Sequence, residues 1–363
     1  MAVGAEIANK LPLIGIMRSL IAWKMLFYLR FFAQLTLKKN TPTIIGIAGS
    51  VGKSTARDGL YAVLKNHAPT YVVSGNSETG IPLGVLGLNP GTYSVIDWIR
   101  IIISAPFRIN NLKNIAYLIV EMGIDGPKAP KNMEYLLTII KPDISIVLNE
   151  TPAHIGNYES ILPSKNKLTD KQKLSTILEY MTLDDGKIIT HNKQTVSITN
   201  ADDPLIKKLI INPFQKVSGI TLMTFGSSHK NTIVYDGYVL NSKKTIYSYI
   251  VKTKEKPRRI SLTLTGYALP KETQSIFASI ILTCDHVGMS LAAIKLHLEK
   301  NFTLPPGRGS ILEGIQNTMI IDSSYNASKA SVSSFINMVK ILKKTTRKNA
   351  VFLFGDMKEL GST

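Results

Sequence analysis

A strand, a short glycine-containing turn and a helix start follow one another near residue 50, and they constrain the fold more than any other feature. Residues 43–48 are largely apolar and mostly β-branched, which is typical of a buried strand. Apolar Leu60, Val63 and Leu64 recur further on at helical spacing. Between them lies the segment Gly49-Ser50-Val51-Gly52-Lys53-Ser54-Thr55. Loop amides and the positive end of the following helix attract anions, so the sequence predicts a phosphate-binding loop.

Two residues of this loop have predicted chemical roles. In a nucleotide-binding loop of this kind, Lys53 reaches the outer phosphates and the Ser54 hydroxyl binds Mg²⁺. The strict pattern has glycine where Ile47 stands, so the match fails at one position. An ordinary strand, turn and helix without a ligand is the alternative. The order Gly-Lys-Ser-Thr between a strand and a helix favours the nucleotide loop.

The charge balance indicates which partners suit the chain. Basic residues outnumber acidic ones by 43 to 25, a formal net charge of +18, which favours anionic partners. A solvated basic surface is the alternative for most of these lysines. The basic run 252–259 has no interleaved aromatic residues, so we predict no nucleic-acid partner. The single cysteine, Cys284, excludes an internal disulfide and predicts a reducing, cytoplasmic location.

Residues 1–40 differ from the rest of the chain because they are rich in Leu, Ile, Phe and Met. Arg18, Lys24 and Arg30 interrupt the apolar residues of this segment, so we predict no spanning helix. No small-residue cleavage site follows the apolar part, so we also predict no cleaved signal. Two possibilities remain open. The segment 11–37 is either an amphipathic helix at the membrane surface or a helix packed on its own protein.

Segments 71–74, 116–120 and 144–148 are predicted strands that alternate with helical segments. This alternation predicts an α/β fold with a doubly wound, mostly parallel sheet. Ligands bind such sheets at the carboxyl ends of the strands. The candidate residues at those ends are Lys53, Glu121, Asn149 and His154. Taken singly, Glu121 also suits a surface carboxylate, and His154 also suits a packed or capping histidine.

The second half of the chain predicts a smaller β region between helical segments. We expect a helix in the later part of 160–180, a turn at 184–186 and strands at 188–190 and 196–198. Short and mostly antiparallel strands should follow within 217–265. Residues 273–300 should be helical, with a break near Gly288.

A Pro- and Gly-rich linker at 304–309 precedes the start of another α/β unit, with a strand at 318–321, a helix at 331–343 and a strand at 350–354. We therefore predict three parts: an apolar and basic helical segment (1–40), an ATP-binding domain (41–304) and a partial C-terminal domain (305–363).

With these elements placed, eight segments in the same order resemble motifs of the Mur ligase family, over about residues 40–363. They are 48–55, 76–82, 121–123, 149–154, 200–203, 307–308, 322–327 and 355–361. The resemblance is strongest to the branch that adds D-alanyl-D-alanine to the cell-wall precursor. Thr79 and Ser323 depart from the residues usual at their positions. Each segment is weak evidence alone, and the common order makes the set specific.

The chain also departs from the family in three larger ways. The family's N-terminal domain, which grips the uridine nucleotide, is replaced by the 40 apolar and basic residues. The family's carbamylated lysine best matches Lys171, with Lys167 as a rival, because the stretch after His154 is expanded. The chain ends inside what the family has as a third domain, so we expect a fragment that binds ATP without completing the reaction.

The resemblance implies an ATP-dependent ligase that joins D-alanyl-D-alanine to UDP-N-acetylmuramoyl-tripeptide through an acyl phosphate. It implies ATP and Mg²⁺ as cofactors, with Ser54 and Glu121 at one metal and His154 with the carbamate of Lys171 at a second. It also implies nucleotide contacts from the loop residues 49–55, Asn149, Arg308 and Asp322. The residues that it implies for substrate binding are Asn76, Ser77, Glu78, Tyr325 and Asn326.

Two other functions remain open at this point. One is a different amide ligase of the same architecture, such as the diamino-acid-adding Mur ligase or a folylpolyglutamate synthase. The other is a membrane-associated nucleotide-binding protein without ligase activity, which would bind ATP but show no amine-dependent phosphate release.

Overall fold

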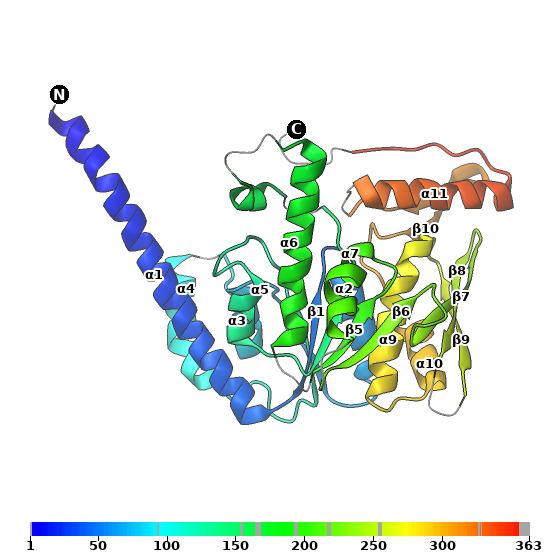
Figure 1. The fold of residues 1–363 in the computed structure, drawn as a ribbon, viewed down its shortest axis with the longest axis horizontal. Coiled ribbons are helices and arrows are strands. Elements are labelled where there is room, and N and C mark those ends of the chain that lie inside the picture. Colours follow the sequence, from blue (N-terminus) through cyan, green and yellow to red (C-terminus); the bar gives the residue numbers. More distant parts are fainter. Residues whose placement is uncertain are drawn as a thin grey trace.

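The computed structural model describes residues 2–92, 94–152, 155–163, 168–191, 195–215, 219–252, 256–325, 327 and 329–355, with side chains from Leu20 onward except those of residues 317, 329 and 330. Within these residues, one sheet has nine strands in the order β2-β3-β1-β4-β5-β6-β7-β8-β9 (Figure 1). The strands are β1 (Thr43–Ala48), β2 (Thr70–Val72), β3 (Tyr117–Glu121), β4 (Ile144–Val147), β5 (Val196–Asn200), β6 (Thr221–Gly226), β7 (Ile233–Leu240), β8 (Lys244–Val251) and β9 (Arg258–Thr265).

The central strands of this sheet are parallel. β1 lies between β3 and β4, and pairing stays parallel from β2 to the short β6–β7 contact. β7, β8 and β9 pair antiparallel. The prediction of antiparallel strands in 217–265 is therefore wrong for β6, because β6 continues the parallel order on β5. The predicted doubly wound, mostly parallel α/β fold is confirmed.

The sequence of β1 explains why helices cover both faces of the sheet. Ile45 and Ile47 lie in the apolar cluster on one face, whereas Ile44 and Ala48 lie in the cluster on the other. Successive side chains of a strand point to opposite faces, and a strand that is apolar on both sides needs cover on both.

Helices α2, α9 and α10 cover one face, and α3, α5, α6 and part of α1 cover the other (Figure 1). The helices are α1 (Ala2–Asn40), α2 (Lys53–Leu64), α3 (Gly80–Leu86), α4 (Val95–Ser104), α5 (Met133–Ile139), α6 (Asp170–Thr190), α7 (Pro204–Ile206), α8 (Asn212–Phe214), α9 (Gln274–His286), α10 (Leu291–Asn301) and α11 (Lys329–Thr346). Shorter turns of helix are η1 (Ala105–Arg108), η2 (Ile155–Ile161), η3 (Lys207–Ile211), η4 (Lys271–Thr273) and η5 (Ile315–Asn317).

Helix α6 overturns two local predictions. Residues 184–186 and 188–190, predicted as a turn and a strand, belong to one continuous helix. Ile177, Met181, Ile188 and Ile189 are buried along it, at spacings that keep them on one helical face. Burial of this apolar face against the sheet outweighs the local turn preference of Asp-Asp-Gly.

The part after residue 304 is small. β10 (Ser310–Glu313) and β11 (Met319–Asp322) form an antiparallel hairpin, and α11 packs beside it through Met338 and Leu342. The predicted strand at 350–354 is wrong, since the structure has no strand in the described residues 347–355. A strand needs a neighbour for its backbone hydrogen bonds, and none among the described residues provides them. Val351 and Leu353 are accordingly exposed by 87% and 96%.

Part of helix α1 packs on its own protein, which is one of the two possibilities that the sequence left open. Its Leu29 and Ala33 are fully buried against the protein. By length and composition, Leu20–Asn40 also qualifies as a helix that could cross a membrane, and 22% of its tested window is buried. This finding does not test the prediction that Arg18, Lys24 and Arg30 exclude a spanning helix.

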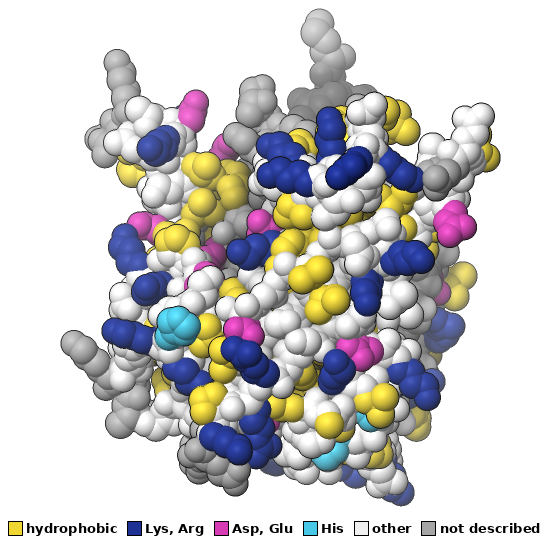
Figure 2. All heavy atoms as spheres, turned by 90° about the vertical axis from the view of Figure 1, so that its right-hand side faces the viewer, with side chains coloured by type: hydrophobic (Ala, Val, Ile, Leu, Met, Phe, Trp, Pro, Cys, Tyr) yellow, Lys and Arg dark blue, Asp and Glu magenta, His cyan; other side chains and the backbone are white. Residues whose placement is uncertain are grey.

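The excess of basic residues is visible on the surface. Lys and Arg side chains are spread over the face shown in Figure 2 and gather at its top, over the region of α11. The last turn of α11 contains Lys343 and Lys344.

Candidate nucleotide-binding site

The turn between β1 and α2 has the backbone of a phosphate-binding loop. Gly49 and Gly52 have φ angles of 115° and 94°, which glycine adopts without strain. A Cβ atom on Gly49 would lie 3.2 Å from the Asn149 carbonyl oxygen, and one on Gly52 would lie 2.8 Å from the Ile276 side chain. Larger residues would therefore be strained at both positions and would disturb the loop.

The start of α2 is open to an anion. The N-cap residue Gly52 makes no side-chain capping hydrogen bond. The amides of the first helical turn, which includes Lys53, Ser54 and Thr55, have no partner within the helix. These amides and the helix dipole favour a phosphate group at this end. Lys53 Nζ donates a hydrogen bond to the Gly49 carbonyl, which keeps its charge above the loop.

The structure brings together the two residues predicted for the first metal. Ser54 Oγ donates to Glu121 Oε2 at 3.2 Å, and Glu121 is only 5% exposed at the end of β3. Hydroxyl and carboxylate oxygens suit Mg²⁺, which takes further ligands from phosphate and water. The donor set therefore fits the metal. In the described part of the chain, no three His, Cys, Asp or Glu side chains form a larger metal-binding group.

Arg57 is a site residue that sequence reasoning missed. Its Nη1 lies 2.7 Å from Glu121 Oε1 and balances the buried carboxylate. Arg57 follows Ser54 by three residues on α2, so both lie on one helical face. This spacing of three residues is the signal in the sequence that could have identified Arg57.

A buried acidic pair under the loop was also missed. Asp185 Oδ2 accepts a 3.0 Å hydrogen bond from the Gly49 amide, and Glu150 Oε2 accepts one of 3.0 Å from Ser50 Oγ. Burial raises the pKa of Asp185 to about 6, while the Lys53 charge acts in the opposite direction. Burial, and then the charge of Asp185, raise the pKa of Glu150. Because Asp184 and Asp185 were predicted to form a turn, nothing in the sequence placed them here.

Asn149 lies against the loop, as its position at the end of β4 predicted. Its carbonyl accepts from the Ser50 amide at 2.9 Å, and its side-chain oxygen accepts from Asn200 Nδ2. Asp203 accepts from the Glu150 amide at 2.9 Å. The predicted segment 200–203 thus meets the predicted segment at 149 in space.

Arg308 also reaches the loop from the C-terminal part, and Tyr325 lies against Arg308. Arg308 Nη1 donates to Thr55 Oγ1 at 3.3 Å, and the guanidinium carbon lies 4.2 Å from the centre of the Tyr325 ring. Asp322 is held differently, since it accepts 2.7 Å and 3.1 Å hydrogen bonds from the hydroxyl and amide of Ser324. These bonds lower the pKa of Asp322.

The predicted substrate loop lies beside Glu121. The Asn76 carbonyl accepts from the Gly123 amide at 2.8 Å, and Ser77 Oγ accepts from the Gly80 amide at 3.1 Å. Glu78 is half-buried in the same loop.

Lys171 does not lie at the loop. It is exposed in the first turn of α6 and precedes Asp185 by 14 residues, about 21 Å along the helix. His154, Asn326, Lys167 and residues 356–361 of the last motif lie outside the described residues. Their roles, and that of Lys171, stay predictions.

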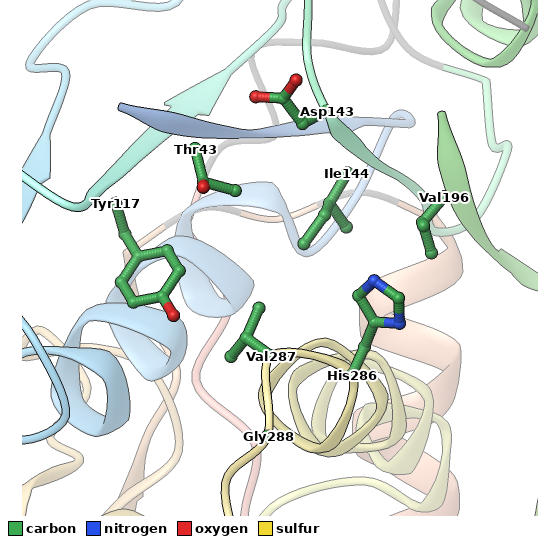
Figure 3. A pocket seen from close by; sticks show the side chains of 8 residues that line it. All are labelled: Thr43, Tyr117, Asp143, Ile144, Val196, His286, Val287 and Gly288. Atoms are coloured by element: carbon green, nitrogen blue, oxygen red, sulfur yellow. The ribbon is translucent and has the colours of Figure 1, made fainter. Parts of the chain in front are cut away.

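A cavity of about 570 Å³ lies at the opposite end of the sheet (Figure 3). Thr43, Tyr117, Ile144 and Val196, at the amino ends of β1, β3, β4 and β5, line it together with His286. The nucleotide loop lies at the carboxyl ends of these strands, so this cavity is separate from the candidate site.

The comparisons with known proteins agree with this geometry. The model of the Mur ligase middle domain matches residues 47–269, more than half of the chain. The UDP-N-acetylmuramoyl-tripeptide--D-alanyl-D-alanine ligase of Buchnera aphidicola subsp. Baizongia pistaciae is 25% identical over 330 residues, covering 89% of this chain and 58% of that protein.

Solved structures share the fold. MurF from Acinetobacter baumannii superposes with a TM-score of 0.65 at 18% identity, covering 93% of this chain and 61% of that one. MurF ligase from Thermotoga maritima in complex with ADP gives 0.63 at 20% identity, covering 87% and 61%. The chain thus spans about three fifths of the length of these proteins. Since a family model covers most of its sheet and its nucleotide loop, this chain belongs to the Mur ligase family.

Proposed function

We propose that this protein is an ATP-dependent amide ligase that adds D-alanyl-D-alanine to UDP-N-acetylmuramoyl-tripeptide in peptidoglycan synthesis. The observation that carries the proposal is the meeting of Arg308 with Thr55 beside the Ser54–Glu121 pair. A nucleotide loop with two metal-binding residues suits any ATPase. An arginine contributed from the C-terminal part suits a ligase in which the phosphoryl group passes from ATP to the substrate between two parts of the protein. The curated relatives carry the name of this ligase.

The proposed roles follow from position. Lys53 and the first-turn amides of α2 bind the outer phosphates of ATP, and Asn149 lies beside the nucleotide. Ser54 and Glu121 hold Mg²⁺, which when bound neutralises charge on the phosphates. Arg308 approaches the transferred phosphoryl group, and Asp322 the ribose. His154 would contribute to a second metal site. The carbamylated lysine predicted for that site, Lys171 or its rival Lys167, stays a prediction, because Lys171 lies far along α6 from the loop.

In the proposed reaction, the tripeptide carboxylate attacks the γ-phosphorus of ATP and displaces ADP, which gives an acyl phosphate. The dipeptide amine then attacks the acyl carbon, and inorganic phosphate leaves as the amide forms. Asn76, Ser77 and Glu78 on one side, with Tyr325 and Asn326 on the other, are the proposed substrate contacts. This chemistry depends on positioning and charge neutralisation.

The proposed location is the cytoplasm, with residues 11–37 at the inner face of the membrane. The apolar and basic composition of α1 supports this location. We propose no nucleic-acid partner.

The test measures two quantities separately. ATP binding is measured on the 363-residue chain. Phosphate release is measured on the protein isolated from its own cells, in the presence of ATP and UDP-N-acetylmuramoyl-tripeptide. Release that depends on D-alanyl-D-alanine supports the proposal. Release that depends instead on a diamino acid or glutamate would assign another amide ligase. ATP binding with no amine-dependent release would favour a nucleotide-binding protein without ligase activity.

A further inference from the structure

Helix α4 presents its apolar side to solvent. Ile96, Ile99 and Ile103 are exposed by 78%, 52% and 62%, and Phe107 in the following turn by 82%. Ile101 is the buried residue of the helix. A helix on the surface of a globular protein normally has the reverse arrangement, with its apolar stripe against the core. The outward stripe therefore calls for a partner.

Helix α1 has a similar outward stripe. Phe27 and Phe31 are exposed by 61% and 47%, and Leu20 and Leu35 continue the stripe at spacings of four and seven residues. On the other side of the same helix, Leu29 is fully buried. One side of α1 thus packs on the protein. The opposite side is apolar, and none of the described residues covers it.

The two stripes border a common seam. Tyr28 Oη donates to the Ile102 carbonyl at 2.7 Å, and Leu29 packs in one cluster with Ile101. Phe27 and Ile103 are the sequence neighbours of Tyr28 and Ile102, and both are exposed. In Figure 1, α4 lies next to the C-terminal half of α1 at the edge of the molecule, in agreement with the Tyr28–Ile102 hydrogen bond. We call this surface the α1–α4 face, defined by Phe27, Phe31, Ile96, Ile99, Ile103 and Phe107.

The charged residues of the two segments that form the α1–α4 face are mostly basic. Within 20–40 and 94–109 the sequence has six basic residues and one acidic residue: Lys24, Arg30, Lys38, Lys39, Arg100, Arg108 and Asp97. Asp97 is engaged in the capping box of α4, where it accepts hydrogen bonds from Thr92 and Ser94. Lys24 lies within the α1 stripe, and Arg100 lies one helical turn from both Ile96 and Ile103.

We propose that the α1–α4 face docks on an anionic phospholipid bilayer, with α1 and α4 lying together in its interface. An apolar stripe with flanking Lys and Arg is the composition that binds such interfaces. A second copy of the chain fits less well, because a two-fold contact would oppose like charges on both copies. The inference deepens the proposed membrane location and adds α4 to it.

The experiment is sedimentation of the 363-residue chain with vesicles of phosphatidylcholine and phosphatidylglycerol in equal amounts, at low salt. We expect binding that weakens with added salt and with pure phosphatidylcholine. Ile99→Glu with Ile103→Glu should reduce binding about tenfold or more. The matched control is Leu183→Glu with Leu296→Glu, on α6 and α10, where the apolar side chains are similarly exposed by 52% and 58%. It should bind like the wild type.

Thermal unfolding and ATP binding of each variant confirm that its fold is intact. If the α4 variant binds vesicles like the wild type while Phe27→Glu with Phe31→Glu does not, α1 docks alone and the proposal is overturned. A wild-type chain that ignores vesicles but forms a dimer by light scattering would assign the face to a second copy. Either outcome with normal ATP binding leaves the proposed ligase function standing.

Discussion

At the residue scale, Lys53 is the side chain on which nucleotide binding depends most. It lies at the start of α2, where the N-cap residue Gly52 provides no side-chain cap. Lys53→Ala should weaken ATP binding about tenfold or more, because hydrogen bonds to charged groups contribute about 1.5–3 kcal/mol. Calorimetric titration measures this. Lys65→Ala, just past the other end of α2, is the matched control. If a folded Lys53→Ala variant bound ATP with the affinity of the wild type, the assignment of the loop would be contradicted.

The Glu150–Asp185 pair adds a pH dependence at the same scale. Each carboxyl has one buried oxygen without a hydrogen-bond partner among the described residues, Glu150 Oε1 and Asp185 Oδ1. A proton held by the pair would supply the missing donor. Asp185 then acts as a positioning residue, because its other oxygen fixes the Gly49 amide.

Asp185→Asn tests this directly. Burial raises the pKa of Asp185 from 3.8 to about 6, so between these pH values the folded protein keeps a proton that the unfolded chain has released. The free energy of unfolding should therefore fall as pH rises from about 4 to about 6, by about 3 kcal/mol from this group. In Asp185→Asn this fall should shrink.

Urea unfolding at a series of pH values measures the effect. Asp170→Asn, an exposed change on the first turn of α6, should leave the wild-type profile unaltered. The same slope in wild type and Asp185→Asn would show that the carboxyl does not hold the proton.

At the scale of elements, the β10–β11 hairpin is joined to α2 through Arg308. The guanidinium bridges Thr55 and the Tyr325 ring, so the contact depends on an aromatic face rather than on the tyrosine hydroxyl. Tyr325→Ala should lower the free energy of unfolding by about 0.5–1 kcal/mol, as expected for an exposed cation–π contact. Tyr325→Phe should stay close to wild type. Equal losses in the two variants, by urea unfolding, would rule out the ring contact.

At the scale of the whole molecule, ATP and Mg²⁺ should stabilise the fold together, because the site joins β1, β3, β4 and α2. A ligand at 100 times its Kd adds about 2.7 kcal/mol to the free energy of unfolding. Thermal unfolding with ATP should show a Mg²⁺-dependent increment that a chelator removes. Glu121→Gln should lose this increment, and the exposed Glu134→Gln should keep it. A Glu121→Gln variant with the full increment would show that Glu121 is no ligand.

The sequence by itself determined the local elements and the edge of the sheet that carries the site. The strand, glycine loop and helix at 43–64 form as predicted, and Glu121 and Asn149 lie beside the loop because carboxyl ends of parallel strands share one edge. The family follows from motif order. These features depend on short spacings and on strand direction, both of which a sequence displays.

Only the tertiary structure decided which distant side chains meet. Asp185 contacts Gly49 across 136 residues of chain, and Arg308 contacts Thr55 across 253. Such contacts depend on strand order and on which face a helix turns to the sheet, and neither is encoded in local spacing. The same reason explains α6, where burial of one apolar face overrode a predicted turn. It also explains α4, whose apolar stripe faces outward because its other side is anchored on α1 through Ile101 and Ile102.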